Sequence, residues 1–201
     1  DTSDAGFLVA GSGDAYYVND GFTEGDEYTT VVGDNAAGGK SPDAPMASLI
    51  AMFNAYDLGP GDTVYVDTGN YVLPRNLVIG AADAGVTIQG PVSDDAVLDR
   101  GNTASGSYTI ELVDADDVTL SHLLITGGYY GVYASNTSDS DNVVIEHSEV
   151  YGNKLEGIYI DRSNDDVLLL DDRMHDNGSG QAGAWLYGAR AQVLGGEYYG
   201  G

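Results

Sequence analysis

Three short stretches rich in aspartate and asparagine recur in the second half of the chain, at residues 114–117, 139–142 and 163–166. Aligned on one another they form two columns, one of Asp116, Asp141 and Asp165 and one of Asp117, Asn142 and Asp166. Calcium takes about six to eight oxygen ligands from carboxylates, amides and backbone carbonyls. Calcium is therefore the cofactor that the sequence suggests, with metal ligands at Asp116, Asp117, Asp141, Asp165 and Asp166. Tight turns without a metal are the alternative, because Asp and Asn side chains bond their own backbone.

Tyrosine is abundant, with 15 residues among 201. Six tyrosines in the second half of the chain could form a surface on which sugar rings stack: Tyr129, Tyr130, Tyr133, Tyr151, Tyr159 and Tyr187. The alternative is that these rings pack at the corners of the fold, since tyrosine suits strands and carries a polar tip.

Three histidines could suggest a metal centre. His122 and His147 align in one column, and His175 falls in another. Zinc needs about three or four ligands that converge on one point, whereas a column places its members along a line. We therefore expect these histidines to be solvated or stacked on one face, without a metal.

Columns of this kind require a repeated unit that stacks in register, and the chain contains one. Equivalent runs begin every 24 or 25 residues, at Val118, Val143, Val167 and Ala191. A second series recurs every 26 residues, at Gly131, Gly157 and Gly183. Short β-branched runs between Gly, Asn and Asp, without helical periodicity, are typical of an all-β solenoid of the parallel β-helix type. Each strand should pair with its equivalent one coil on, about 4.8 Å away.

The same alignment separates core positions from surface positions. Two columns are predicted to be buried, one of Leu120, Ile145, Leu169 and Val193 and one of Ile125, Val150, Met174 and Tyr198. A third column, Leu124, Glu149, Arg173 and Glu197, places an arginine between two glutamates. Opposite charges on adjacent strands contribute about 0.2–1 kcal/mol per pair, so we interpret this column as structural.

Composition limits the function classes. Seven basic residues against 32 acidic ones give a net charge of −25, a field that repels nucleic acid and anionic lipid. Nucleic acid is therefore not an expected partner. No apolar run is long enough for a membrane span, so membrane insertion is not expected either. The hydrophobic fraction of 42% suffices for one narrow core. An acidic, lysine-poor surface favours an extracellular or cell-surface location.

The first part of the chain is less regular. Residues 1–62 should form N-terminal strands and a capping helix, and residues 63–201 the coils of the same single domain. Apolar residues at Met46, Leu49, Ile50 and Phe53 predict an amphipathic helix over 44–57, with Asp43 as N-cap and Pro45 in the first turn. This helix should cover the open end of the first coil. Strands are predicted at 7–10, 16–18, 28–32, 63–66, 77–79, 86–89, 96–98 and 108–113.

Residues 45–49, 59–71 and 86–91 resemble the opening of right-handed parallel β-helix domains of the pectate-lyase-like superfamily. The resemblance is closest to modules of very large secreted or surface proteins. It implies a right-handed coil and a longer parent chain, with further β-helix coils or domains as neighbours. The superfamily includes polysaccharide lyases, hydrolases, epimerases and modules without known chemistry, so the resemblance is specific for fold rather than for activity.

If the chain is an enzyme, the resemblance implies a polysaccharide lyase or epimerase in which a basic residue abstracts the C5 proton of a uronate. The candidates are Lys154, Arg162, Arg173 and His175. Seven basic residues spread over the chain do not make a basic groove for a polyanion, and the sequence motifs expected of the superfamily's hydrolases and alginate epimerases are absent. The main prediction is therefore an extracellular structural, adhesive or carbohydrate-interacting module without catalysis. A polysaccharide or cell-surface glycan is the expected partner.

Overall fold

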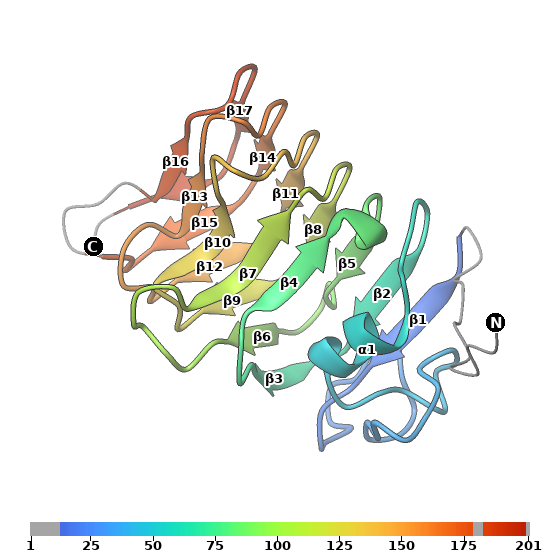
Figure 1. Ribbon diagram of the computed structural model, residues 1–201. Coiled ribbons are helices and arrows are strands. Elements are labelled where there is room, and N and C mark those ends of the chain that lie inside the picture. Colours follow the sequence, from blue (N-terminus) through green and yellow to red (C-terminus); the bar gives the residue numbers. More distant parts are fainter. Residues whose placement is uncertain (1–12, 179–182, 200–201) are drawn as a thin grey trace, which may run out of the picture.

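A computed structural model describes residues 13–178 and 183–199. Three parallel sheets wind along one axis (Figure 1). The seven-stranded sheet contains, in spatial order, β1 (Ala15–Val18), β2 (Thr63–Val66), β5 (Thr87–Gln89), β8 (Thr119–Ser121), β11 (Val144–Glu146), β14 (Leu168–Leu170) and β17 (Gln192–Leu194). The six-stranded sheet contains β3 (Gly69–Val72), β6 (Ala96–Asp99), β9 (Leu124–Thr126), β12 (Glu149–Tyr151), β15 (Arg173–His175) and β18 (Glu197–Tyr198). The five-stranded sheet contains β4 (Leu77–Gly80), β7 (Tyr108–Val113), β10 (Tyr130–Ala134), β13 (Ile158–Ile160) and β16 (Ala184–Leu186).

Each coil visits the three sheets in turn and then returns to the first, which makes a right-handed parallel solenoid. Strands pair with their equivalents in the register that the repeat predicts: Ile145 lies between Leu120 and Leu169, and Val150 lies between Ile125 and Met174. The predicted fold class is thus confirmed, and the two core columns are confirmed for the first three members of each. All six of these side chains are fully buried. For Val193 and Tyr198, the last members of the two columns, the prediction of burial is wrong: both are exposed, because among the described residues the last coil has a neighbouring coil on one side only.

The early strands agree with the prediction over 16–18, 63–66, 77–79, 86–89, 96–98 and 108–113 to within a residue or so, and β3 is an additional strand. The strand predicted at 28–32 is wrong. The backbone N–H groups of Tyr28 and Thr29 donate to the carboxylate of Asp67 instead of to a neighbouring strand. The strand predicted at 7–10 lies outside the described residues.

The helix α1 (Leu49–Ala55) is shorter than the predicted 44–57. Its N-cap is Ser48, whose hydroxyl accepts from the Ala51 N–H, and not Asp43. Pro45 precedes the helix because Met46 is held in an extended bridge with Val18 of β1. The backbone of Met46 bonds to Tyr17 and Asn19, which excludes helical hydrogen bonding there.

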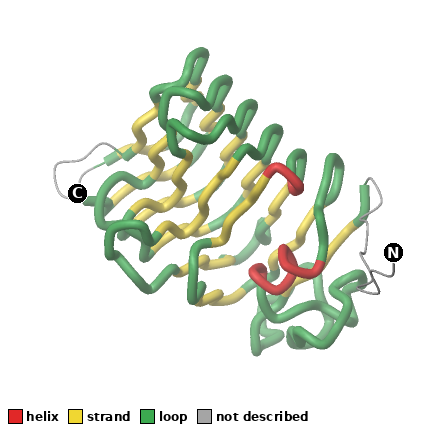
Figure 2. The backbone as a smooth tube through the Cα atoms, in the orientation of Figure 1, coloured by secondary structure: helices red, strands yellow, loops and turns green. Residues whose placement is uncertain are grey.

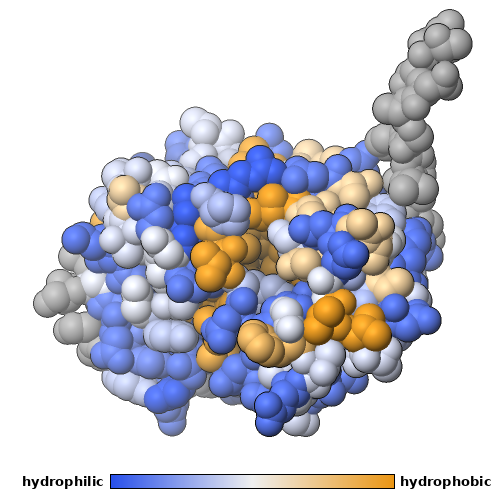
Figure 3. Space-filling view, turned by 90° about the horizontal axis from the view of Figure 1, so that it is seen from below, coloured by the Kyte–Doolittle hydropathy of each residue, from blue (hydrophilic) through white to orange (hydrophobic). Residues whose placement is uncertain are grey.

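Leu49 and Met52 bury one side of α1 in the common core. The helix contacts β4, at the first edge of the five-stranded sheet (Figures 1 and 2). A short 3-10 helix, η1 (Ala81–Asp83), follows β4. Within the described residues, no helix has the length and apolar character needed to cross a membrane. Seen from below, most of the surface is polar, and apolar residues gather around a hollow near the middle of the face (Figure 3).

Candidate functional site

Aromatic rings line the outer side of the five-stranded sheet. Alternation along each strand turns Val132 and Ile158 into the core and Tyr133 and Tyr159 outward. The strand register extends this outward column to Trp185. We call the full set the aromatic face; its members are Tyr108, Tyr129, Tyr130, Tyr133, Tyr159, Trp185 and Tyr187.

The rings of the aromatic face form a continuous row from coil to coil. Tyr130 stacks on Tyr133 with centroids 5.4 Å apart and ring planes 3° apart, and on Tyr159 at 4.9 Å. Tyr159 contacts Trp185 at 5.9 Å. Burial, with the Glu156 carboxylate as the next cause, raises the pKa of Tyr130. Its hydroxyl therefore stays protonated at neutral pH and can donate a hydrogen bond.

The structure brings together five of the six predicted carbohydrate-binding tyrosines: Tyr129, Tyr130, Tyr133, Tyr159 and Tyr187. Tyr151 does not belong with them, because it lies on β12 in the six-stranded sheet. Sequence reasoning missed Tyr108 and Trp185. Trp185 occupies the same place in its repeat as Tyr133 and Tyr159, so aligning the repeats would have placed it in the same outward column. Tyr108 pairs with Tyr130 on a less regular coil.

A cavity of about 240 Å³ lies at one end of the aromatic face, lined by Asn136, Tyr159, Asp161, Arg162 and Tyr187. The Arg162 guanidinium lies over the Tyr187 ring, 5.9 Å from its centroid. Aromatic rings beside a few hydrogen-bonding groups suit a ligand that has both apolar faces and hydroxyls. This end of the aromatic face therefore combines aromatic rings with hydrogen-bonding groups around one cavity.

The four candidate catalytic residues occupy separate places. Arg173 and His175 lie on β15 of the six-stranded sheet, and both bind Glu149, Arg173 at 2.9 Å and His175 at 2.7 Å. Arg162 lies beyond β13, beside the five-stranded sheet. Lys154 is exposed between β12 and β13. Among the described residues, no hydrogen bond or ion pair joins Lys154 or Arg162 to the Arg173–His175 pair.

The surroundings of Arg173 and His175 are those of a structural cluster. Arg173 lies 3.8 Å from Glu197 as well as 2.9 Å from Glu149, so the predicted ion ladder is present. The His175 ring is stacked between Tyr151 and Tyr199, each with its centroid 5.4 Å away. Burial alone would lower the pKa of His175, but its bonds to Asp176 and Glu149 outweigh burial and raise that pKa.

The aspartate columns bond the coils to one another. The Asp116 carboxylate accepts from the backbone N–H of Asp141 at 2.9 Å, and the Asp141 carboxylate accepts from that of Asp165 at 2.6 Å. In the second column Asp117 and Asp166 have φ near +57°, the left-handed conformation that Asp and Asn tolerate in turns (58° and 56°). The described part of the chain contains no group of three or more His, Asp or Glu suited to a metal. Calcium at these columns stays a prediction that would use the second carboxylate oxygens of Asp116 and Asp141, whereas both carboxylate oxygens of Asp166 accept from the Arg190 guanidinium.

Thermal unfolding in millimolar calcium and in chelator, at matched ionic strength, tests this prediction. If calcium binds the column, it raises the melting temperature of the wild type, because a ligand that binds only the folded state stabilises it. Asp141→Asn removes the charge but keeps an oxygen that can accept from Asp165, so the fold should persist while the calcium effect is lost. Identical melting of the wild type in both buffers, or a full calcium effect in the variant, would show that the column consists of turns alone.

His122 and His147 lie in one column, with ring centroids 5.1 Å apart and ring planes tilted by 47°. Both have positive φ, 54° and 50°, at the short turn between the seven-stranded and six-stranded sheets. Burial, and then the neighbouring His147, lowers the pKa of His122. The pair lies along the coil axis, so it presents a line of rings rather than a converging set of ligands.

A family model described as a right-handed beta helix region matches residues 54–195. The chain belongs to this right-handed β-helix family. The crystal structure of pectate lyase Pel9A is similar to it, with a TM-score of 0.68 at 16% sequence identity. That likeness covers 94% of this chain and 47% of Pel9A, so the chain spans about half the length of the lyase. At this identity the likeness shows the β-helix fold alone. No curated protein sequence matches the chain.

Proposed function

We propose that this protein is an extracellular β-helix module that binds a polysaccharide or cell-surface glycan along the aromatic face, without catalysis of its own. The observation that carries the proposal is the unbroken row of rings from Tyr108 to Trp185 on the outside of one sheet. Coils follow one another at about 4.8 Å, a step comparable to the length of one pyranose unit. Because the tyrosines from Tyr108 to Tyr159 stack on one another, successive rings can contact successive sugars of one glycan chain through their edges rather than their faces.

Packing at the corners of the fold is the competing explanation, and it accounts for the partly buried tyrosines of the earlier coils. Trp185 is 43% exposed and Tyr187 is 44% exposed, and both lie in the last coil, where a neighbouring coil covers one side only among the described residues. The proposal therefore rests on the row of rings and on the cavity lined by Tyr159 and Tyr187 rather than on this exposure. The net charge of −25 disfavours a polyanion. The favoured ligand is therefore a neutral glycan, which binds by contact with the rings and by hydrogen bonds from groups such as Asn136 and Arg162.

Further coils or domains of a longer chain are the second class of proposed partner. Within residues 13–178 and 183–199, the strands β16, β17 and β18 of the last coil each pair on one side only. Val193 and Leu194 on β17 are about half exposed, at 48% and 50%. An additional coil would cover both the strand edges and these apolar side chains.

A polysaccharide lyase or epimerase acting on uronate by C5 proton abstraction is the alternative function. One observation favours it: Arg162, a basic residue of the type such lyases use, lines the cavity beside Tyr159. Asp161 lines the same cavity, and a carboxylate so close to the base would oppose the binding of a uronate carboxylate unless a cation lay between them. This geometry supports binding better than turnover.

Affinity electrophoresis through gels containing single polysaccharides, neutral glucans, mannans and xylans beside pectate and alginate, tests the proposal. We expect at least one neutral glycan to retard the wild type, and Tyr159→Ala to weaken the binding roughly two- to tenfold, as expected for loss of one ring contact. Tyr151→Ala, the same change on the six-stranded sheet, is the matched control and should bind as the wild type does.

The same polysaccharides, incubated with the protein and followed by the absorbance of unsaturated uronates, test the alternative. The proposal predicts no absorbance change. Product formation that Arg162→Ala abolishes would establish the lyase function and overturn the proposal, as would equal retardation of the wild type and Tyr159→Ala.

A further inference from the structure

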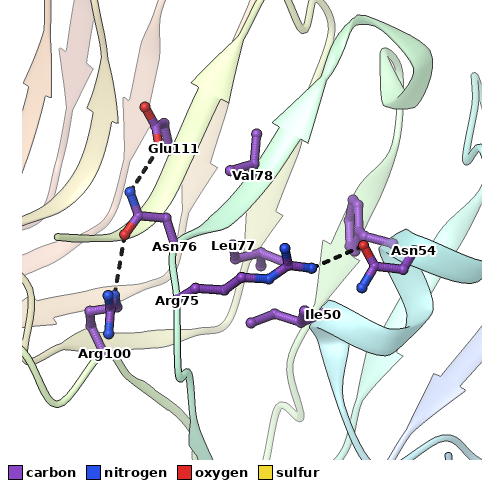
Figure 4. Close-up of a pocket in the computed structure, with 9 residues that line it drawn as sticks. Ile50, Asn54, Arg75, Asn76, Leu77, Val78, Arg100 and Glu111 are labelled. Atoms are coloured by element: carbon purple, nitrogen blue, oxygen red, sulfur yellow. Dashed lines mark hydrogen bonds between the residues drawn. The ribbon is translucent and has the colours of Figure 1, made fainter. Parts of the chain in front are cut away.

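A cleft between α1 and the start of β4 has the size and lining of a small-molecule site (Figure 4). Its volume is about 420 Å³, within the range of roughly 300–1,000 Å³ that is usual for such sites. The apolar part of its wall consists of Ile50, Phe53, Leu77 and Val78. The polar part comes from Asn54, Arg75, Asn76, Arg100 and Glu111. Ligand pockets combine apolar side chains with a small number of placed polar groups, and this cleft has four apolar and five polar lining residues.

Two arginines line this cleft, and neither has a carboxylate partner within the described residues. Arg75 donates one hydrogen bond, to the Asn54 side chain at 3.0 Å. Arg100 donates to the Asn76 side chain at 3.2 Å and to the Leu73 carbonyl at 3.1 Å. A guanidinium carries five N–H donors, so most of those on Arg75 are free to bind a ligand.

Glu111, the one acidic residue of the lining, is bonded by Asn76 rather than by an arginine. The Asn76 amide donates to Glu111 at 2.8 Å and lies between Glu111 and Arg100 (Figure 4). The cleft thus has two positive groups and one negative group, in a chain whose net charge is −25. Of the three arginines elsewhere, Arg173 and Arg190 are paired with carboxylates, and Arg162 lines a cavity together with Asp161. Unpaired arginines in so acidic a chain make this cleft the local exception to its repulsion of anions.

We propose that the cleft binds a small carboxylate that carries an aromatic ring or a branched alkyl body. The carboxylate accepts two parallel hydrogen bonds from the Arg75 guanidinium, the geometry that a planar fork of donors favours. The apolar body then lies against Ile50, Phe53 and Leu77, which belong to the apolar part of the wall. Glycan binding at the aromatic face is a separate event, because none of the rings of that face lines this cleft.

A purely structural role for Arg75 is the competing explanation, since its bond to Asn54 joins α1 to the segment before β4. That role predicts a lower melting temperature when Arg75 is replaced, and no ligand. The proposed role predicts selective recognition of a carboxylate. Arg75→Met separates the two, because methionine keeps part of the apolar stem and removes every donor.

Isothermal titration calorimetry at low ionic strength, with 3-phenylpropanoate as the probe, tests the proposal. The neutral 3-phenylpropanamide controls for the charge, and acetate and inorganic phosphate control for the apolar body. We expect 3-phenylpropanoate to bind the wild type roughly tenfold or more tightly than the amide, since a charge-assisted hydrogen bond is replaced by a neutral one. Acetate and phosphate should bind at least as weakly as the amide.

Two variants and one control complete the experiment. Arg75→Met should weaken 3-phenylpropanoate binding roughly tenfold or more, to the level of the amide. Val78→Trp, at a position 46% exposed, should fill the cleft and abolish binding while both arginines remain. Arg173→Met, on the six-stranded sheet, should bind as the wild type does. No binding of 3-phenylpropanoate to the wild type, equal affinity for acid and amide, phosphate bound as tightly as the acid, or undiminished binding by both cleft variants would overturn the proposal.

Discussion

Replacing Asp67 with alanine is expected to free the N-terminal loop and to lower the free energy of its opening by about 3 kcal/mol or more, the value of one or two hydrogen bonds to a buried charge. Asp67 is fully buried. Its carboxylate accepts from the backbone N–H groups of Glu27, Tyr28 and Thr29, at 2.7, 3.0 and 2.6 Å. The Thr29 hydroxyl and the Thr68 N–H donate to it as well, at 2.8 and 2.9 Å.

Amide hydrogen exchange measures this effect directly. The N–H groups of Glu27, Tyr28 and Thr29 should exchange roughly 100-fold faster in Asp67→Ala, the factor that corresponds to about 3 kcal/mol. Glu24→Ala, which removes one exposed carboxylate from the same loop, controls for the change in net charge and should leave these amides protected. Unchanged exchange in Asp67→Ala would show that other contacts hold the loop.

Replacing Asp172 with asparagine is expected to remove a pH-dependent loss of stability. Asp172 is fully buried between the seven-stranded and six-stranded sheets. One carboxylate oxygen accepts from the Ser148 N–H at 2.9 Å, and the other has no hydrogen-bond partner among the described residues. Burial raises the pKa of Asp172 from 3.8 to about 7, although backbone hydrogen bonds oppose the rise.

The sign of the pH effect follows from the raised pKa. Between pH 4 and pH 7 the unfolded chain ionises Asp172 while the folded protein keeps it protonated, so folding loses stability as the pH rises through this window. From pH 4.5 to pH 8 the free energy of unfolding of Asp172→Asn, relative to wild type, should rise by about 3 kcal/mol. Comparing each variant with wild type at the same pH cancels the contributions of other carboxyl groups. The effect of burying the amide itself does not depend on pH, so it cancels when the two pH values are compared.

Denaturant unfolding at both pH values gives the measurement. Asp139→Asn, an exposed aspartate of the same half of the chain, is the matched control and should show a difference from wild type that does not change with pH by more than a few tenths of a kcal/mol. An equally small change for Asp172→Asn would mean that this carboxyl group is ionised in the folded protein.

The regular half of the fold could be predicted because its information is local and repeated. Intervals of 24 to 26 residues fix the pairing, so the columns through Ile145 and Val150 followed from alignment alone. The loop before α1 could not be predicted in this way. Its conformation depends on Asp67, about 40 residues further on, and a lone buried carboxylate leaves no periodic signal in the sequence.

The candidate site could likewise be predicted only in part. The tyrosines could be recognised by type, but only the strand register separates Tyr151 from Tyr159, since neighbouring stretches of one coil lie on different sheets. For that reason Arg162 and Arg173, close in sequence, lie on different sides of the solenoid. The cleft at Arg75 had no sequence signal, because its wall joins α1 to strands of two later coils.

The chain contains a single tryptophan, so glycan binding at the aromatic face can be measured directly by fluorescence. Trp185 lies on the aromatic face, with its ring centroid 5.9 Å from that of Tyr159 and 5.4 Å from that of Tyr187. A glycan that occupies this face must change the environment of the indole. The measurement is the emission of Trp185 during titration with oligosaccharides of the polysaccharide that retards the protein most in gels.

We predict a saturable change in Trp185 emission for the wild type and for Tyr151→Ala, and a roughly two- to tenfold weaker titration for Tyr159→Ala. Emission that stays constant while the glycan is bound would place the binding surface elsewhere on the protein and contradict the proposed binding at the aromatic face.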